Sequence, residues 1–333
     1  MKRLKVSFIL GIYNAERTLN ACLESIFMQD YPRLKYEVII VDGGSTDRTL
    51  RIVKDFMKKY PNIKLFHNQK KLSEGRGMSK DIGVNKSKGE IVIFLDHDNI
   101  ILHKDWLKNI LYPFNDSEIM VSQSQLEFKD TDSNFIKYIN ALGVEDPFAA
   151  PVSLLSQIIF HPERFKIIDG KYYLYKVNEK NLLFGGANGC AFRKKVFSKI
   201  NGYTRDVDVF ASMAEYEMLV AVPIYSRIHH ETSNDMLTFL KKKGVYFFRF
   251  INAEYKEKKF RWIPKDFRGK IKFALAIFYN LTLLGPSILA LRQIIKTKRF
   301  FWIIHPFFLF FITLEYGLIT LFRFRNFIKI SDN

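Results

Sequence analysis

Short apolar runs, separated by segments of helical periodicity, recur through the first hundred residues. The runs are Val6–Leu10, Tyr36–Val41, Ile63–Phe66 and Ile91–Leu95. Between the first two runs, apolar residues recur at the three- and four-residue spacing of a helix face, from Leu19 to Phe27. Strands that are apolar at nearly every position and alternate with helices indicate a parallel sheet covered on both faces. We therefore predict an α/β fold.

Two of the predicted strands end in acidic residues. Asp42 closes "YEVIIVD", and Asp96 and Asp98 close "EIVIFLDHD". Ligands of open parallel sheets bind beyond the carboxyl ends of the strands, so these acids are expected in one crevice. A buried carboxylate is costly unless a cation meets it, and Mg²⁺ and Mn²⁺ favour oxygen ligands shared with substrate phosphates. Asp96 and Asp98 therefore predict a metal-bound diphosphate, with the capping of a turn as the alternative.

The net charge and the cysteine content indicate which partners and which compartment suit this protein. The 333 residues carry a formal net charge of +18, which favours anionic partners such as nucleic acid, acidic phospholipid or phosphorylated small molecules. The two cysteines, Cys22 and Cys190, signal no disulfide framework and favour a reducing compartment. The basic, apolar N-terminus imitates a signal peptide, but the helical pattern that follows it favours a first strand.

Four segments, taken together, resemble a known family. In chain order they are "VSFILGIYNAERTLNACLESIFMQDYP", "YEVIIVDGGSTDRTLRIV", "GEIVIFLDHDN" and "NGCAFRKKVFSKINGY". Over residues 4–235 this combination resembles the family-2 inverting glycosyltransferases with the GT-A fold. The resemblance implies a mixed, mainly parallel sheet with flanking helices, which binds a nucleoside diphosphate sugar together with Mg²⁺ or Mn²⁺.

The resemblance assigns donor-binding roles to the acids at the strand ends. Asp42 matches the acid that contacts the nucleotide base, Asp96 the first acid of the DxD motif, and Asp98 the acid that ligates the metal. Lys80 stands where relatives carry an arginine close to the donor diphosphate, and lysine lacks the bidentate fork of arginine. We expect Arg76 or Lys80 at the phosphates; a solvated helix face would explain both equally well.

A glycine-rich segment and a histidine pair complete the implied donor site. The segment "FGGANG" borders the donor sugar in relatives, so Gly186 and Asn188 are assigned there, with a plain turn as the alternative. His229 and His230 follow "VPIYSRI", where a family histidine can complete the metal or diphosphate site. Because successive strand residues point to opposite faces, at most one histidine is expected there. His229 is taken as the metal ligand, with a hydrogen-bonded structural histidine as the alternative.

Inversion at an anomeric carbon also requires a base that takes the proton of the acceptor. The resemblance places this base one helix and one strand before the "VP" step, and Asp206 in "TRDVDVF" is the best match. Arg205 occupies the position that glutamate usually holds. Asp208 and Glu215 are the rival candidates, and a plain helix-start acid is the structural alternative for Asp206.

The last third of the chain is basic and apolar. Two apolar stretches, Phe273–Leu291 and Phe300–Phe322, reach the ~20 residues that cross a bilayer as a helix. We expect a GT-A domain at 1–235, a basic amphipathic interface segment at 236–270, and two apolar helices, spanning or re-entrant, with a basic tail at 271–333. A buried hairpin or an oligomer interface is the alternative. The "KKFRW" sequence departs from the QxxRW motif of processive synthases, so processivity is not inferred.

The sequence thus predicts a membrane-associated glycosyltransferase with a cytoplasmic catalytic domain. It would transfer a sugar from a UDP- or GDP-sugar to a lipid-linked or glycan acceptor by metal-dependent inverting displacement. A nucleotidyltransferase on a similar sheet would also use paired acids and a metal, but it would release pyrophosphate. A basic nucleic-acid-binding protein fits the net charge and little else, so nucleic acid is not expected as a partner.

Overall fold

The chain forms two compact units, described here from a computed structural model. The structure describes residues 4–68, 70, 75–180, 182–186, 188–233, 235–249, 251, 259–260 and 266–331. The first unit joins residues 1–127 to 152–231, and the second joins 128–151 to 232–333. Residues 128–151 therefore group with the C-terminal part of the chain, although they lie inside the predicted domain 1–235.

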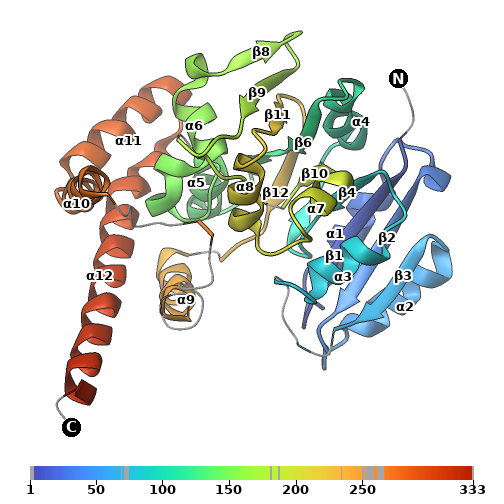
Figure 1. The fold of residues 1–333 in the computed structure, drawn as a ribbon, viewed down its shortest axis with the longest axis horizontal. Helices are drawn as coiled ribbons and strands as arrows, with labels where there is room; N and C mark the ends of the chain where they lie inside the picture. The colour runs from blue at the N-terminus through green and yellow to red at the C-terminus, as the bar shows by residue number, and fades with distance from the viewer. Residues whose placement is uncertain are drawn as a thin grey trace. The chain divides into compact units, whose positions relative to one another are not determined.

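The first unit is built on a nine-stranded sheet (Figure 1). Its strands, in spatial order, are β3 (Ile63–His67), β2 (Tyr36–Asp42), β1 (Val6–Ile12), β4 (Ile91–Phe94), β10 (Cys190–Arg193), β6 (Ile119–Gln123), β11 (Leu219–Pro223), β9 (Tyr172–Lys176) and β8 (Lys166–Ile168). The first four strands in this order pair in parallel, and β10 runs antiparallel between β4 and β6. The predicted α/β fold is confirmed, and each of the four predicted strands is present.

Alternate residues of β1 face the two sides of the sheet. Val6, Phe8 and Leu10 lie in one apolar core with the inner faces of α1 (Leu19–Phe27), α2 (Thr49–Lys59) and α4 (Trp106–Leu111). On the other side α3 (Ser79–Lys86) packs on the sheet so closely that a Cβ at Gly83 would lie 2.3 Å from Ile9 Cγ2. Helices on both faces bury the central strands and bring α3, which follows β3, to their carboxyl ends.

A small second sheet lies in the same unit. It pairs β5 (Asn99–Ile100) with β12 (Arg227–His230), and β12 with β7 (Gln125–Glu127). The β5 strand directly follows the DxD segment, and in the antiparallel register His230 lies opposite Asn99. This pairing brings a segment near residue 230 to the end of β4.

The second unit is helical. Its helices are α5 (Asn134–Leu142), α9 (Met236–Arg249), α10 (Phe267–Leu281), α11 (Leu284–Thr297) and α12 (Ile304–Ser331), which the short η6 (Phe300–Ile303) precedes. The predicted apolar stretch Phe273–Leu291 is divided between α10 and α11, which bend by 70° at a break where Leu283 has a φ of 59°. Part of the predicted interface segment lies outside the described residues, which include only Lys259 and Phe260 of "KKFRW".

Candidate active site

Asp42 lies at the carboxyl end of β2, inside a tight turn. Its carboxylate accepts hydrogen bonds from the backbone N–H of Gly44 at 2.9 Å and from the hydroxyl of Ser45 at 2.5 Å. Gly44 has a φ of 88°, a conformation that glycine adopts without strain. The His67 imidazole, at the end of β3, lies 3.7 Å from the same carboxylate. The turn thus fixes Asp42 at the edge where parallel-sheet ligands bind.

Lys80, near the start of α3, connects two candidate site acids. Its Nζ lies 3.3 Å from Asp96 Oδ1 and 3.4 Å from Asp206 Oδ1, and its side chain is only 1% exposed. The hydroxyl of Tyr203 donates a further hydrogen bond to Asp206. A buried ammonium between two carboxylates offsets the desolvation of all three charges. The first acid of the DxD motif and the candidate base are therefore neighbours in space.

Burial has a further effect on Asp96. It raises the pKa of the Asp96 carboxyl above its ordinary value, and the Lys80 ammonium opposes this effect. The nearby carboxylates of Asp98 and Asp206 raise the pKa further. A positive charge arriving with a ligand would favour the ionised form of this group.

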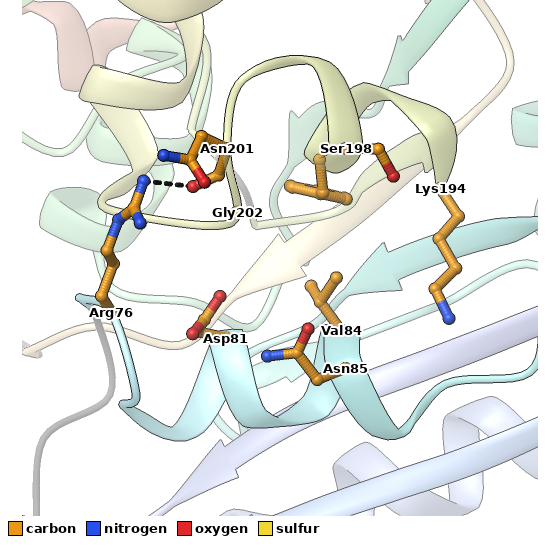
Figure 2. A pocket seen from close by; sticks show the side chains of 9 residues that line it. Arg76, Asp81, Val84, Asn85, Lys194, Ser198, Asn201 and Gly202 are labelled. Carbon is orange, nitrogen blue, oxygen red and sulfur yellow. Dashed lines mark hydrogen bonds between the residues drawn. The ribbon is translucent and has the colours of Figure 1, made fainter.

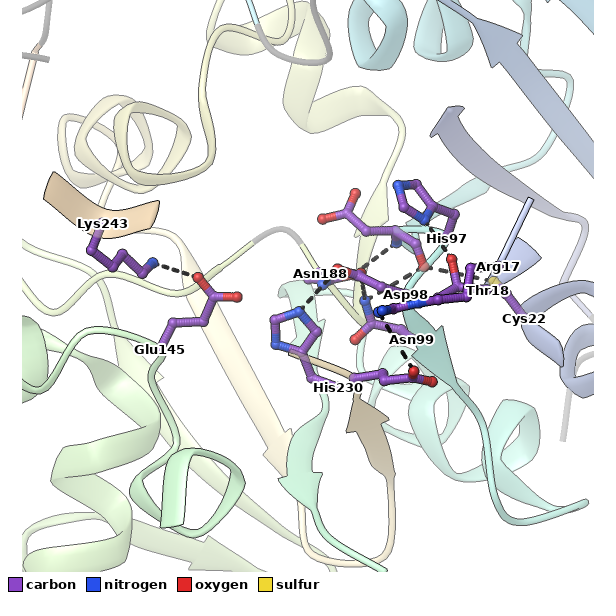
Figure 3. A network of polar contacts seen from close by, with 12 residues as sticks. Arg17, Thr18, Cys22, His97, Asp98, Asn99, Glu145, Asn188, His230 and Lys243 are labelled. Atoms are coloured by element: carbon purple, nitrogen blue, oxygen red, sulfur yellow. Dashed lines mark hydrogen bonds and ion pairs between the residues drawn. The ribbon is translucent and has the colours of Figure 1, made fainter. Parts of the chain in front are cut away.

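Asp98 lies beside a histidine of the second sheet (Figure 3). His230 Nε2 is 3.4 Å from Asp98 Oδ2, and the Asn99 side-chain amide donates to Asp98 Oδ1 at 2.9 Å. The backbone N–H of Glu231 donates to the Asp98 carbonyl at 2.8 Å, which ties β12 to the DxD segment. The structure thus brings His230 to Asp98, whereas the role of His229, the neighbour on β12, stays a prediction.

These residues fit a divalent cation that is bound together with a phosphate ligand. Within the part of the chain that the structure describes, no group of three or more His, Cys, Asp or Glu side chains is arranged to hold a metal ion. Asp98 supplies a carboxylate and His230 an imidazole nitrogen. Mg²⁺ is typically held by one or two carboxylates, with substrate phosphates and water completing its coordination. The donor set therefore suits a cation that shares its ligands with a diphosphate.

The two adjacent glycines of the "FGGANG" segment, Gly185 and Gly186, differ in how closely other residues pack against them. A Cβ at Gly185 would lie 2.1 Å from Gln123 Oε1 and 2.4 Å from Phe210 Cζ, so this glycine is required for packing. At Gly186 the nearest atom of the described residues beyond its chain neighbours would be 3.9 Å away, so no close contact among them requires glycine there. Asn188 accepts a hydrogen bond from the Asp96 backbone N–H at 2.9 Å. The segment therefore positions the DxD motif, and Gly186 and Asn188 remain predicted donor contacts.

Arg76 lies at a pocket of about 350 Å³ between α3 and α7 (Lys195–Lys199), shown in Figure 2. Its guanidinium donates a hydrogen bond to the Asn201 carbonyl. Asp81 accepts from the backbone N–H groups of Gly77 at 2.9 Å and Tyr203 at 3.1 Å. These contacts join the turn before α3 and the start of α3 to the turn after α7, so Arg76 has a structural role here and its phosphate contact stays a prediction.

The three candidate bases lie at different places on α8 (Asp206–Ala214). Asp206 is the first residue of the helix, close to Lys80. Asp208 is only 5% exposed, and Glu215 lies exposed at the opposite end of the helix. The described contacts bring Asp206 to the DxD motif through Lys80, and its role as the base stays a prediction.

Two contributors to this site were not predicted from the sequence. Tyr203 lies in "NGYTRD", where no pattern distinguishes it from a packing residue. His230 was considered together with His229, but only the register of β12 against β5 shows which residue lies near Asp98. Side-chain direction along a predicted strand could have separated the two histidines if the register had been known.

Comparison with known proteins identifies the family. Residues 7–200 match the family model described as Glycosyl transferase family 2. Glycosyltransferase AglE of Haloferax volcanii is 31% identical over 123 residues, which cover 37% of this chain and 40% of AglE. A dolichyl N-acetyl-alpha-D-glucosaminyl phosphate 3-beta-D-2,3-diacetamido-2,3-dideoxy-beta-D-glucuronosyltransferase of Methanococcus voltae is 36% identical over 107 residues, 31% of this chain and 32% of the relative. The chain thus spans less than half the length of either relative.

A solved structure shares the fold. The mannosyltransferase PcManGT from Pyrobaculum calidifontis, in complex with GDP-Man and Mn²⁺, superposes with a TM-score of 0.55 over 95% of this chain and 88% of that one, at 16% identity. The predicted GT-A fold, a mixed sheet with flanking helices followed by C-terminal helices, is therefore confirmed. Because the family model matches more than half of the chain, this protein belongs to glycosyl transferase family 2.

Proposed function

We propose that this protein transfers a sugar from a nucleoside diphosphate sugar to an acceptor hydroxyl or phosphate, with inversion. The observation that carries the proposal is the position of Lys80 between Asp96 and Asp206. This arrangement joins the acid of the donor motif to the candidate base through one buried ammonium. Family membership and the GDP-Man bound to PcManGT support a UDP- or GDP-sugar as the donor.

The chain's own residues supply the donor site in this proposal. Asp42 accepts hydrogen bonds from the nucleotide base, Asp96 lies at the ribose, and Gly186 and Asn188 border the sugar. Asp98 and a histidine, His229 as predicted or His230 as the geometry favours, would hold Mg²⁺ or Mn²⁺ with the diphosphate. The cation supplies positive charge that stabilises the leaving nucleoside diphosphate.

Asp206 acts as the general base. The acceptor oxygen attacks the anomeric carbon on the face opposite the diphosphate, its proton passes to the Asp206 carboxylate, and the bond to the diphosphate oxygen breaks. Lys80 and Tyr203 both contact Asp206 Oδ1, which orients the carboxylate. A positioned base of this kind contributes about 10²–10⁴-fold to the rate.

We further propose that the enzyme is membrane-associated, with its catalytic unit in the cytoplasm and a lipid-linked or glycan acceptor. The described chain contains one helix long and apolar enough to cross a membrane, Phe300–Phe322, and a bent pair, α10 and α11, that passes the same test together. The dolichyl phosphate named for the Methanococcus voltae relative supports a lipid-linked acceptor.

The test measures nucleoside diphosphate release by the detergent-solubilised full chain, supplied with UDP- and GDP-sugars and Mn²⁺ or Mg²⁺. Asp206→Asn should lower turnover by about 10²-fold or more and keep nucleotide binding, because the amide cannot accept the proton. Asp98→Ala should lower both. The control is Glu215→Gln, at the exposed end of α8, which should match the wild type. Full activity of Asp206→Asn, or pyrophosphate as the product, would contradict the proposal.

A further inference from the structure

The helices of the second unit leave an extensive apolar surface exposed. Among the described residues, eighteen large hydrophobic side chains between Phe267 and Phe322 are exposed. On α10 they form one stripe at helical spacing, which consists of Phe267, Ile271, Leu275 and Phe278. A matching stripe on α11 consists of Leu284, Ile288, Leu291 and Ile295. Soluble monomers rarely expose contiguous apolar surface on this scale, so a partner must cover it.

The charge on these helices identifies the partner. Residues 267–300 contain seven lysines and arginines and no acidic residue. All seven side chains are exposed, among them Arg268, Lys272, Arg292 and Lys296 on α10 and α11. Apolar stripes flanked by exposed basic residues suit an anionic phospholipid surface, where apolar side chains enter the acyl region and basic ones meet lipid phosphates.

The polar contacts of α12 argue against a transmembrane orientation. Tyr316 donates a hydrogen bond to Asp146 at 2.5 Å, and Gly244 of α9 packs against the Glu315 side chain. Next to Asp146, Glu145 forms an ion pair with Lys243 of α9 at 2.5 Å. Eleven residues earlier on α12, His305 pairs with the Tyr138 hydroxyl of α5 at 2.8 Å. The second unit thus holds α12 by polar groups at two levels.

Any crossing by α12 would carry this polar cluster into the bilayer. A span of ~20 residues within 300–331 must include Glu315 and Tyr316, wherever it begins. It would therefore place Asp146 and the Glu145–Lys243 pair at the depth of the hydrocarbon, where charged groups are costly. The exposed large hydrophobic side chains of α12 up to residue 322 form a stripe on the face opposite His305 and Tyr316, which includes Phe307, Phe311, Leu314 and Leu318.

We infer that the second unit docks on one leaflet of an anionic membrane, with α10, α11 and the outer face of α12 in the interface and no helix crossing it. Figure 1 shows these three helices in orange and red. The arrangement rests on the proposed membrane attachment of the enzyme and is independent of the reaction that it catalyses. It also keeps the basic connector between α11 and η6 on the same side as the rest of the chain, without moving its charges across the bilayer.

Cysteine labelling in sealed membrane vesicles tests the topology. Cys22 and Cys190 are both buried, so a membrane-impermeant maleimide should label the native full chain only weakly. Lys296→Cys, Asn333→Cys after α12, and Leu34→Cys at a position that is 98% exposed in the first unit should all be labelled from the same side. Labelling of Lys296→Cys or Asn333→Cys from the side opposite to Leu34→Cys would establish a spanning arrangement and overturn the inference.

Flotation of the purified full chain with liposomes tests the partner. The protein should float with phosphatidylglycerol-containing vesicles and several-fold less with phosphatidylcholine alone or at high salt. Leu275→Glu with Ile288→Glu should weaken flotation by about tenfold or more, whereas Leu34→Glu should leave it unchanged. Failure to float, with a stable oligomer in detergent-free buffer, would assign the surface to a second copy and overturn the inference. Docking without nucleoside diphosphate release would refute only the proposed reaction.

Discussion

At the scale of single residues, the site depends on a buried lysine. Lys80 is near the start of a short helix, and in sequence it is separated from Asp206 by 126 residues. Its ammonium lies between two carboxylates that the proposal gives to different steps, donor binding and proton transfer. A point charge can serve both carboxylates, which need not lie in one plane as a bidentate arginine contact would require.

Two substitutions of Lys80 distinguish the effect of its positive charge from the effect of its side-chain geometry. Lys80→Met should lower kcat by about 10-fold or more and lower the melting temperature, because two carboxylates then face each other without a cation. Lys80→Arg should recover a large part of the stability and less of kcat, because the charge returns but the geometry changes. Steady-state kinetics and thermal melting of the two variants test this. Unchanged kcat in Lys80→Met would show that the ammonium is not needed to position Asp206.

The two neighbouring glycines of "FGGANG" provide a matched pair of variants. Gly185→Ala should destabilise the fold by about 2 kcal/mol or more, because its Cβ would overlap Gln123 and Phe210. Gly186→Ala should leave the melting temperature nearly unchanged, because its Cβ would make no close contact with the described residues. If the Gly186 backbone borders the donor sugar, Gly186→Ala should raise KM for the donor while the melting temperature stays nearly unchanged. Equal melting temperatures for both variants would contradict the packing argument.

Among the elements of the sheet, β2 is connected to its two neighbouring strands by the side chain of Glu37. It accepts hydrogen bonds from Ser7 of β1 at 2.7 Å, from Lys64 of β3 at 2.6 Å and from the Lys88 backbone N–H at 2.6 Å. Burial by itself would raise the pKa of the Glu37 carboxyl, but these hydrogen bonds outweigh it and lower the pKa below its ordinary value. The ionised carboxylate therefore links three strands and the segment before β4.

The lowered pKa of Glu37 gives its stabilisation a defined pH dependence. A carboxyl with a lowered pKa in the folded state stabilises the fold above its ordinary pKa of about 4.5, and the contribution is lost as the pH falls below that value. Glu37→Gln should therefore cost about 1 kcal/mol at pH 7, allowing for the solvent around Lys64. The difference from the wild type should shrink toward pH 3 in denaturant titrations. A cost that does not change with pH would assign the effect to packing.

At the scale of the whole molecule, the second unit draws on two distant parts of the chain. The α5 helix, from the segment 128–151, packs its aromatic residues against C-terminal helices within that unit. The ring centroids of Phe135 and Phe308 lie 5.2 Å apart, and those of Tyr138 and Trp302 lie 5.8 Å apart. Residues 128–151 thus interrupt the glycosyltransferase sequence and belong to the unit that we propose to dock on the membrane.

This division predicts how a truncated chain behaves. A chain that ends at residue 235, the boundary expected from composition, should aggregate, because α5 then exposes aromatic side chains whose burial contributes about 1.5–3 kcal/mol each. Replacing 128–151 in that truncated chain by a flexible linker of equal length should restore solubility. Size-exclusion chromatography and thermal melting compare the two proteins. A monomeric, cooperatively folded 1–235 chain would show that α5 does not depend on the C-terminal helices.

Local sequence patterns were sufficient to predict the strands of the sheet and the acids that follow them. Apolar runs and helical periodicity are local patterns, and a parallel sheet covered by helices follows from them by the ordinary rules of α/β folds. The order β3-β2-β1-β4 is seen only in the structure. The position of Asp42 and of the DxD acids at the carboxyl edge followed from the same patterns. The order of the sequence motifs also indicated the family, because each motif can be recognised from a short stretch of residues.

Contacts between residues far apart in the chain, in contrast, could be seen only once the chain was folded. The contact of Lys80 with Asp206, the position of His230 beside Asp98 and the grouping of 128–151 with the C-terminal helices all join segments far apart in the chain. Each depends on strand register or helix packing, which local patterns do not encode. Hydropathy likewise predicts that residues 300–322 are apolar enough to span a membrane. The polar partners of His305 and Tyr316, which the sequence does not reveal, oppose such a crossing.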